Sequence, residues 1–589
     1  MKQHSEVRQK VASFIKDSLS FDWCCLLFSL VSTLLLLCSG IVYISITIFD
    51  LEIADYYSWI TAEYAVALTL VGVFLFFVLY FISSLLFEAI NRSRNKTSTE
   101  NQVAPFKICI KRHFLFFFAI LLVCWLPWII AHYPGSLDQD TIWQTLIWRT
   151  PAEWYDHHPW LTTVLFGSVM DLGNGLGSQS VSLFIYTTIQ ALITAATLSL
   201  LFCYIRRFNV PRIIWISFFV IACILPAYAS YASQMVKDSF FVLFWIPFLL
   251  FFIEGIRTRG KCLASPLATI TFILCTILVI LANKKGIYLA LPAVLALCIY
   301  AKPGKRLICS CCLIIPLVFS LTWSNILLPS WGVDKGPSKE LYSLPLQQTA
   351  NYVSQYSDEV TEEERTAIDK VLPYESLPAI YTLTSADSVK DTFKDPDTQD
   401  VLNYLATWIE MGIKHPDSYF AATMGTNYKL FMPAIPFELK ENLNQEWVDE
   451  QVQFFSAFLS SGITNEEIQI RDNTTRVGLA EPSTLQPLRS ILYTYEIALN
   501  YTPLRVINSP SFFAFYLPFF ILCFALSKRN KNSRTRILLC LIPSALLVAS
   551  IIVGPVILGR YCLPALLTGV LIFSLPWIMK QRMALTKHK

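Results

Sequence analysis

Twelve long apolar runs limit what this chain can fold into more than any other feature of the sequence. A helix needs about 20 residues to cross the roughly 30 Å hydrocarbon layer of a bilayer, and helices packed inside a bundle can be somewhat shorter. The runs lie at residues 22–49, 60–88, 113–131, 179–203, 213–231, 239–256, 264–281, 287–301, 307–328, 511–527, 535–557 and 562–579. The sequence therefore predicts an all-α polytopic membrane protein with about 12 transmembrane helices.

The composition excludes several other classes of protein. Apolar residues make up 54% of the chain and charged residues 15%, whereas about 25% of the residues of a typical globular domain are charged. A water-soluble enzyme, a disordered chain and a collagen-like chain are therefore excluded. The formal net charge of +4 is too small to indicate binding to nucleic acid, so we expect a lipid bilayer and no nucleic acid among the partners.

The distribution of Lys and Arg predicts the orientation in the membrane, because these residues concentrate in cytoplasmic loops. If the N-terminus is cytoplasmic, the parts predicted inside hold 28 of the 46 Lys and Arg residues and the short outside loops hold five. Those five are Arg149, Lys237, Lys284, Lys285 and Arg560. We therefore expect a multi-pass protein of the cell membrane with both termini in the cytoplasm.

The apolar stretch from Trp160 to Met170 is predicted to lie flat at the membrane surface. It is too short to cross the hydrocarbon layer, and Asp171 and a glycine-rich run follow it. If this stretch crossed, every later loop would change sides, and the basic clusters within 206–212 and 528–536 would lie outside.

The order of these segments predicts four parts. Residues 1–112 form an N-terminal two-helix membrane segment with a basic cytoplasmic loop, and residues 113–328 form a transmembrane core with an external loop at 132–178. Residues 329–510 form an extracytoplasmic domain, and residues 511–589 form the C-terminal transmembrane helices and a cytoplasmic tail. The extracytoplasmic domain holds 26 acidic and 13 basic residues without an alternating strand pattern, so we expect it to be mostly α-helical.

Polar residues gather in external loops of the predicted topology, where they are informative because polar groups near hydrocarbon are costly. The first loop carries Asp138, Asp140, Gln144, His157 and His158, the second carries Lys237 and Asp238, and the last carries Arg560 and Tyr561. The basic pair Lys284 and Lys285 lies in a further short loop on the same side. These loops form the candidate site.

The residue types of the candidate site suit transfer of a sugar from a lipid-phosphate donor. Asp140 or Asp138 can accept a proton from an attacking hydroxyl as a general base. Asp238 can orient the acceptor, hold a cation or position His158. Arg560, Lys237, Lys284 and Lys285 offer positive charge to a departing lipid phosphate, with the guanidinium binding in a bidentate manner and each ammonium acting as a point charge.

Each of these residues also has a structural interpretation. Asp138 and Asp140 can be solvated loop residues or N-caps of a helix that holds Trp143. His157 and His158 can form a helix-entry turn before Pro159. Lys237 can pair locally with Asp238, and Arg560 can extend to the lipid headgroups. The functional interpretation depends on their joint occurrence at one face of the membrane.

These motifs resemble the GT-C superfamily of membrane glycosyltransferases. Members have an acidic residue in the first large external loop, a His/Pro-rich entry to a juxtamembrane helix and a further acidic residue in a later external loop, here Asp140 (or Asp138), His157-His158-Pro159 and Asp238. A narrower resemblance is to an uncharacterised bacterial family of polytopic proteins. It adds Tyr133-Pro134-Gly135, Gln144, Lys237, Pro345-Leu346-Gln347-Gln348 and Arg560-Tyr561.

The resemblance implies an inverting transferase that passes a sugar from a polyprenyl-phosphate donor to a glycan, lipid or protein acceptor of a bacterial cell envelope. It makes Asp140 the base, gives Asp238 a supporting role and places Arg560 near the donor phosphate, with Gln347 and Gln348 among the substrate-binding residues. Two departures concern the donor phosphate: the chain has Asn283-Lys284-Lys285 where relatives have Arg-Asn, and Asn351 where they have Arg. Metal use differs between branches of the superfamily, with Mg²⁺ or Mn²⁺ as the candidate ion.

Two other functions fit a polytopic chain. A polysaccharide polymerase or ligase also has a large external loop, but such enzymes rely on external arginines, and the short external loops here hold only Arg149 and Arg560. A transporter or flippase usually shows repeated halves and ionisable residues at mid-membrane depth, and neither is visible in this sequence. Glycosyl transfer is therefore the leading hypothesis.

Overall fold

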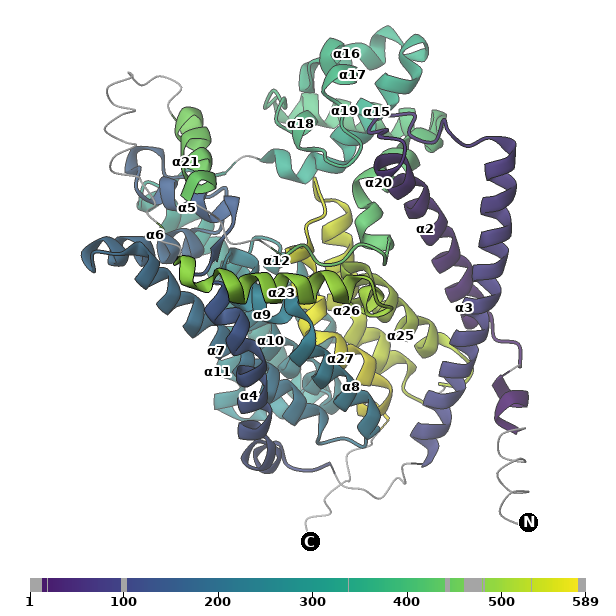
Figure 1. Cartoon of the computed structure of the whole chain (residues 1–589), viewed down its shortest axis with the longest axis vertical. Coiled ribbons are helices and arrows are strands. Elements are labelled where there is room, and N and C mark those ends of the chain that lie inside the picture. The colour runs from purple at the N-terminus through teal and green to yellow at the C-terminus, as the bar shows by residue number, and fades with distance from the viewer. Residues whose placement is uncertain are drawn as a thin grey trace.

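The computed structural model describes residues 13–580 except 19, 97–102, 337, 440–444, 460–478, 480–481 and 531. The described chain is almost entirely helical, and Figure 1 shows a bundle of long helices with a smaller group of helices, α15–α19, at one end. Its named strands are β1 (Ser136–Leu137) and β2 (Gln234–Met235). The prediction of an all-helical architecture is confirmed for the described residues.

Among the described residues, eight helices are long and apolar enough to cross a membrane, and a bent pair makes a ninth. Each lies at one of the predicted apolar runs, so the interpretation as a membrane protein is supported. The eight are α2 (Trp23–Thr47), α3 (Ala62–Lys96), α4 (Phe106–Ala131), α7 (Gln179–Ile205), α10 (Lys237–Thr258), the segment Pro303–Ser330 with α13 (Arg306–Thr322) and α14 (Leu328–Ser330), α26 (Arg534–Ile552), and the segment Gly559–Ile578 with α27 (Leu563–Ile578).

The bent pair and three short helices occupy the other predicted runs. Helices α8 (Arg212–Ile224) and α9 (Pro226–Ala232) meet at 59°. The bend lies at Pro226, which has no backbone N–H to continue the helix and which favours the extended conformation seen at Leu225. The short apolar helices are α11 (Pro266–Ala282), α12 (Gly286–Tyr300) and Phe512–Leu526, which ends in α25 (Leu517–Leu526).

Burial distinguishes the centre of the bundle from its edge. In the most apolar stretch of the segment Gly559–Ile578, which contains α27, 89% of the residues are buried inside the protein, whereas in the corresponding stretch of α3 only 6% are. Helix α27 therefore forms part of the core of the bundle. Helix α3 lies at the edge of the bundle and presents its apolar side chains outward, as a helix in contact with lipid does.

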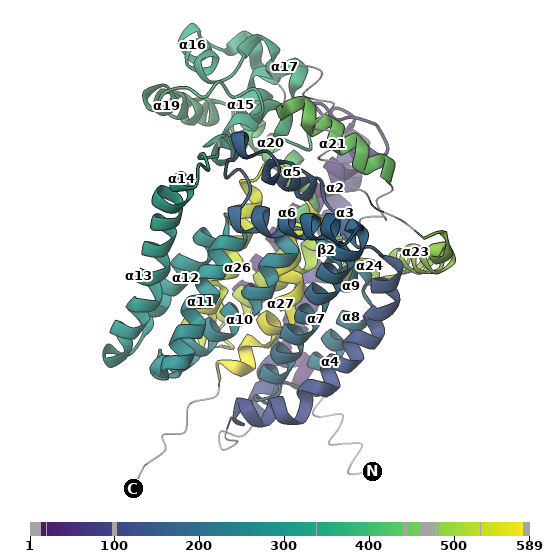
Figure 2. The same ribbon diagram turned by 90° about the vertical axis from the view of Figure 1, so that its left-hand side faces the viewer.

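Helix α6 (Trp160–Gly175) crosses the end of the bundle instead of running along it, as Figure 2 shows. It is not among the helices long and apolar enough to span. Helix α5 (Gln139–Trp148) packs closely on it because Gly167 has no side chain: a Cβ there would lie 2.1 Å from Cγ of Trp148. Helix α6 therefore lies across the axis of the bundle, and its position at the membrane surface stays a prediction.

The group of helices at the end of the bundle has a core of its own. This group of helices, which we call the domain, consists of α15 (Ser343–Tyr356), α16 (Glu362–Val371), α17 (Leu377–Ile380), α18 (Asp387–Lys390) and α19 (Thr398–Lys414), and α20 (Pro416–Phe431) follows it. Thr361 and Glu364 form a capping box that begins α16 in the acidic run. Pro416 fits the first turn of α20 because that position needs no N–H, and α19 ends just before it. The expectation that this domain is mostly α-helical is confirmed for the described residues.

Within the described residues between α20 and Phe512, three α-helices follow this domain. Helices α21 (Gln445–Leu459), α23 (Gln486–Asn500) and α24 (Leu504–Ile507) connect it to the last membrane helices. In Figure 1, α23 runs across the bundle.

A short parallel pair of strands determines where the polar loops meet. Ser136 of β1 lies opposite Gln234 of β2, and Leu137 lies opposite Met235. Gly135, with φ of +115°, allows the turn into β1 that a residue with a Cβ would resist. Parallel strands end at the same edge, so the helices that follow them, α5 and α10, begin side by side.

Candidate functional site

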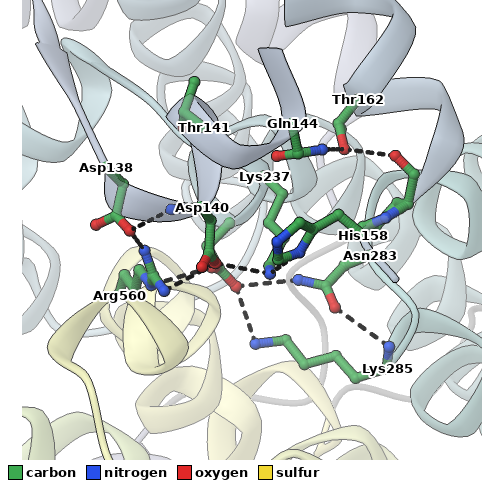
Figure 3. A network of polar contacts seen from close by, with 12 residues as sticks. Asp138, Asp140, Thr141, Gln144, His158, Thr162, Lys237, Asn283, Lys285 and Arg560 are labelled. Atoms are coloured by element: carbon green, nitrogen blue, oxygen red, sulfur yellow. Dashed lines mark hydrogen bonds and ion pairs between the residues drawn. The ribbon is translucent and has the colours of Figure 1, made fainter. Parts of the chain in front are cut away.

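Four segments that are far apart in the sequence meet at the end of the bundle where α5 and α10 begin. Figure 3 shows a polar network of side chains from the starts of these two helices, from the turn before α12 and from the turn before α27. Its charged members are Asp138, Asp140, Lys237, Asp238, Lys285 and Arg560. The structure thus brings together six of the predicted site residues, which we call the charged network.

Arg560 lies at the centre of the charged network, in the 3-10 turn Gly559–Cys562 before α27. Its guanidinium pairs with Asp138, its Nη2 lies 2.9 Å from Oδ2 of Asp140, and its Nε lies 3.7 Å from Oδ2 of Asp238. Only 7% of the side chain is exposed. The alternative that Arg560 extends to the lipid headgroups is therefore wrong, because the side chain is turned into the protein.

Asp138 and Asp140 have different roles at the start of α5. Asp138 is the N-cap of the helix and accepts a bond of 3.3 Å from the backbone N–H of Asp140, so the capping interpretation holds for it. Asp140 accepts from Lys237 at 2.7 Å as well as from Arg560. Its side chain is 21% exposed, compared with 4% for Asp138 and 1% for Asp238. Asp140 is therefore the carboxylate that a substrate can reach most easily.

Asp140 is ionised in this environment. Burial alone would raise the pKa of its carboxyl, but the charge of the Lys237 ammonium outweighs burial and holds that pKa well below its usual range. An ionised carboxylate can accept a proton, which is the requirement for a general base.

His158 accepts a hydrogen bond from Lys237. The ammonium lies 3.0 Å from Nδ1 of the imidazole, and an ammonium can only donate, so Nδ1 carries no proton. Burial, and then the charge of Lys237, lower the pKa of His158 well below its usual value. His158 is therefore neutral and orients Lys237. The expectations that Asp238 positions His158 and that Lys237 pairs with Asp238 are not what the structure shows, because Lys237 itself lies between His158 and Asp140.

Asp238 holds cations and an amide. Its Oδ1 accepts from Nδ2 of Asn283 at 3.0 Å and from Nζ of Lys285 at 3.1 Å, and the ammonium of Lys285 also lies 4.9 Å from the ring centre of Tyr561. Its Oδ2 is buried without a hydrogen bond. Asp238 therefore pairs with the side-chain cations Lys285 and Arg560, and its role in orienting an acceptor stays a prediction.

The remaining predicted residues lie outside the charged network. Gln144 donates to the hydroxyls of Thr162 and Thr163 at 2.8 and 3.1 Å, and so ties α5 to α6. The ring of His157 packs edge-on against that of His158 with centres 4.6 Å apart. Lys284 is half exposed and pairs with Asp156 at 3.1 Å. Gln144 and His157 therefore support the network, and Lys284 lies at its rim.

Gln347 and Gln348 are not brought to the network. Both lie on α15, where Gln347 donates to the carbonyl of Thr382 at 2.7 Å and Gln348 donates to the hydroxyl of Thr423 at 2.9 Å. The indole of Trp408 donates to Gln348 at 3.1 Å. The amides are buried and hold the helices of the domain together.

Two residues of the site were not predicted. Asn283 connects Asp238 to the turn before α12, and the Thr141 hydroxyl donates to the carbonyl of Met235 at 2.5 Å, fixing α5 to β2. The sequence does contain a signal for Asn283, because this polar residue stands directly between an apolar run and a pair of lysines. Thr141 gives no such signal, because its partner is a backbone carbonyl that is distant in the sequence.

The charges of the network balance, with three carboxylates and three cations. In addition, α5, α10, α12 and α27 all begin here, and the N-terminal end of a helix carries partial positive charge. The site therefore favours a further anion, for which backbone N–H groups at helix N-termini are suited.

The donor set does not fit a divalent cation. Within the described parts of the chain, no group of three or more His, Cys, Asp or Glu side chains is arranged to hold a metal ion. Each carboxylate of the network is paired with an Arg or Lys side chain, and such a cation repels a metal ion from the same oxygen atoms.

One comparison with known proteins gives a match. A model described as a family of unknown function (DUF6020) matches residues 142–589, which is most of the chain. No curated protein and no solved structure shows a significant match. The matched region contains Lys237, Asp238, Lys285 and Arg560 and begins two residues after Asp140.

Proposed function

We propose that this chain, which belongs to the family of unknown function DUF6020, is a membrane glycosyltransferase that takes a sugar from a polyprenyl-phosphate donor. The acceptor is a glycan, lipid or protein of the cell envelope. The observation that carries the proposal is the charged network, in which an accessible carboxylate and three cations meet at one end of the apolar bundle. A base and a phosphate site side by side are the two parts that such a transfer needs.

The reaction is a single displacement with inversion. The acceptor hydroxyl attacks the anomeric carbon while Asp140 takes its proton, and the bond between that carbon and the phosphate oxygen breaks. The electron pair of this bond goes to the lipid phosphate, whose negative charge therefore increases. Arg560, Lys237 and Lys285 stabilise that charge, with help from the N-terminal ends of the surrounding helices.

Donor binding strengthens the base in this mechanism. Lys237 and Arg560 both contact Oδ2 of Asp140, at 2.7 and 2.9 Å. A phosphate that binds these cations competes with Asp140 for them, which raises the proton affinity of the carboxylate. Asp140 then becomes an effective base when the donor is in place.

The proposed topology places the reaction at the extracytoplasmic surface. We propose that all twelve apolar helical segments cross the membrane, in a core of GT-C type, and that both termini lie in the cytoplasm. The network and α6 then lie at the outer end of the bundle. A polyprenyl-phosphate sugar presents its anomeric carbon at the membrane surface while its tail stays in the lipid, so donor and network meet at one depth.

The test is a donor assay with the full chain in lipid vesicles. A set of polyprenyl-phosphate donors, each carrying a different sugar, is supplied together with cell-envelope extract as acceptor. The release of free polyprenyl phosphate is measured. We expect release with at least one of these donors, together with transfer of its sugar to the acceptor, and we expect no sugar transfer from nucleotide sugars. Passage of intact donor across the bilayer without release would favour a flippase, and growth of a polymer on the carrier would favour a polymerase. Either result would contradict the proposal.

A further inference from the structure

Helix α23 is fixed at the rim of the bundle, at the level of the charged network. Arg489 donates through Nε to the carbonyl of Ala131 and through Nη2 to the carbonyl of Tyr133, both at 2.9 Å. The hydroxyl of Tyr495 donates to the carbonyl of Ile224 at 2.8 Å. Ala131 and Ile224 are the last residues of α4 and α8. The helix therefore lies where two apolar helices end, and Figure 2 shows it projecting from the side of the bundle at the height of α6 and β2.

The helix is amphipathic, and much of its apolar surface is exposed. Arg489 and Leu499 are buried against the bundle. Ile491 is 65% exposed and Tyr493 is 53% exposed. Ile491 precedes Tyr495 by four residues, so the two share one flank of the helix, whereas Tyr493 lies on the other flank, with Ile497, which is 39% exposed, and Asn500.

The flank with Ile491 and Tyr495 continues the apolar surface of the bundle. Tyr495 extends from this flank to the end of α8. Below that point, Val123 and Leu126 of α4 and Val220 of α8 are 71%, 52% and 46% exposed, which is the surface that a membrane protein presents to lipid. The occupant that fits both surfaces is the bilayer.

We propose that α23 binds the surface of the bilayer, with Ile491 and Tyr495 at the boundary between the headgroups and the acyl chains and with Tyr493 turned toward water. Helices of this kind lie in the membrane plane with the apolar face buried by about 5–10 Å. Tyr side chains are enriched at this boundary because the ring is apolar and the hydroxyl is polar. In α23, the hydroxyl of Tyr495 also satisfies a carbonyl that the bend before Pro226 leaves free.

This binding sets the depth of the charged network. Arg489 holds the chain at Tyr133, which leads through Gly135 and β1 to Asp138. The network therefore lies close to the plane of α23, which is the plane of the lipid headgroups. The inference does not depend on glycosyl transfer, since it concerns only where the helix lies.

The test uses light-induced crosslinking in the full chain in vesicles of phosphatidylethanolamine and phosphatidylglycerol. The photoreactive residue p-benzoylphenylalanine replaces Ile491, Tyr493 or, as a matched control, Ile413, which is 76% exposed on α19. Lipid adducts are detected by mass spectrometry after size-exclusion chromatography has shown that each variant is folded.

We expect lipid adducts at position 491 and only background at positions 493 and 413. Equal lipid adducts at 491 and 493 would contradict the assigned orientation of the helix. Adducts at 491 to a second copy of the chain, or no lipid adduct there, would show that another partner or water covers this flank and would overturn the proposal.

Discussion

The two ends of α10 carry buried charged clusters that differ in how completely their carboxylates are hydrogen-bonded. At one end, both oxygens of Glu254 are used: Oε1 accepts from Arg257 at 2.6 Å, and Oε2 accepts from Tyr204 at 2.8 Å. At the other end, Oδ2 of Asp238 has no hydrogen bond, and Nε of Arg560 lies 3.7 Å away. The cluster at Glu254 is closed around its carboxylate, whereas the charged network leaves one carboxylate incomplete and another accessible.

This difference separates two uses of charge inside a membrane protein. The cluster at Glu254 consists largely of residues within one or two neighbouring helices, and its bonds stabilise the packing of those helices. The charged network joins Asp140 to Arg560, 420 residues further along the chain, and keeps Asp140 partly exposed. A cluster whose only role was to hold helices together would gain nothing from such an accessible carboxylate. The following predictions test this comparison.

The largest effect is expected for Asp140→Asn. The amide cannot accept the proton of the acceptor, and general bases contribute about 10²–10⁴-fold to rate, so carrier release should fall by that factor. The matched control is Asp171→Asn, because Asp171 is a half-exposed carboxylate that lies outside the charged network and bonds to Arg149 and to the indole of Trp148. Wild-type turnover in Asp140→Asn would remove Asp140 from the role of base.

A smaller loss is expected for Arg560→Ala. Hydrogen bonds to charged groups contribute about 1.5–3 kcal/mol each, so kcat/KM for the donor should fall roughly 10- to 100-fold. Arg560→Lys should recover part of this loss, because an ammonium keeps the charge but not the bidentate geometry. The KM values for the donor and for the neutral acceptor are measured separately. If Arg560→Ala changes both KM values by the same factor, a role of Arg560 in phosphate binding is contradicted.

Glu254→Gln should change stability and leave turnover unchanged. Removing the carboxylate leaves the buried charges of Arg257 and Arg207 uncompensated, at a cost of about 3 kcal/mol in the free energy of unfolding. Thermal unfolding in lipid nanodiscs measures this, with Glu410→Gln, an exposed position of α19, as the control. No shift in the unfolding temperature would show that the cluster at Glu254 is not structural.

The smallest effect is a change in the pH dependence of stability. Burial, and then the charge of Lys237, lower the pKa of His157 from 6.5 to about 4. The unfolded chain therefore binds a proton between pH 6.5 and 4 that the folded chain does not, and the free energy of unfolding falls as the pH falls through this range. His157→Gln cannot bind this proton, so its unfolding temperature should vary less with pH than that of the wild type. Parallel curves for the two proteins would contradict this.

The sequence predicted the helices better than it predicted the contacts between them. All twelve apolar runs contain helices, and α6 crosses the end of the bundle as the length of its apolar stretch and the positions of the basic residues required. Apolar runs and the distribution of Lys and Arg are local signals, so a single sequence carries them in full. The topology relative to a membrane stays a prediction.

The sequence predicted which residues form the site but not which of them contact one another. Asp140, Lys237, Asp238 and Arg560 meet as expected, whereas His158 contacts Lys237 and not Asp238. Such pairings depend on the two-residue strands β1 and β2, which are too short to leave a pattern in the sequence. Gln347 and Gln348 were placed in the site by resemblance alone, and their buried bonds hold the helices of the domain together instead.

The most direct test of the account compares two variants of α10, Asp238→Asn and Glu254→Gln, in one assay of carrier release per folded molecule. The account predicts that Asp238→Asn loses most of its turnover, because the amide no longer balances Lys285 and Arg560, while Glu254→Gln keeps the turnover of the wild type. Equal turnover in the two variants would show that the two ends of the helix do not differ in function, and would contradict the assignment of the charged network as the site of sugar transfer.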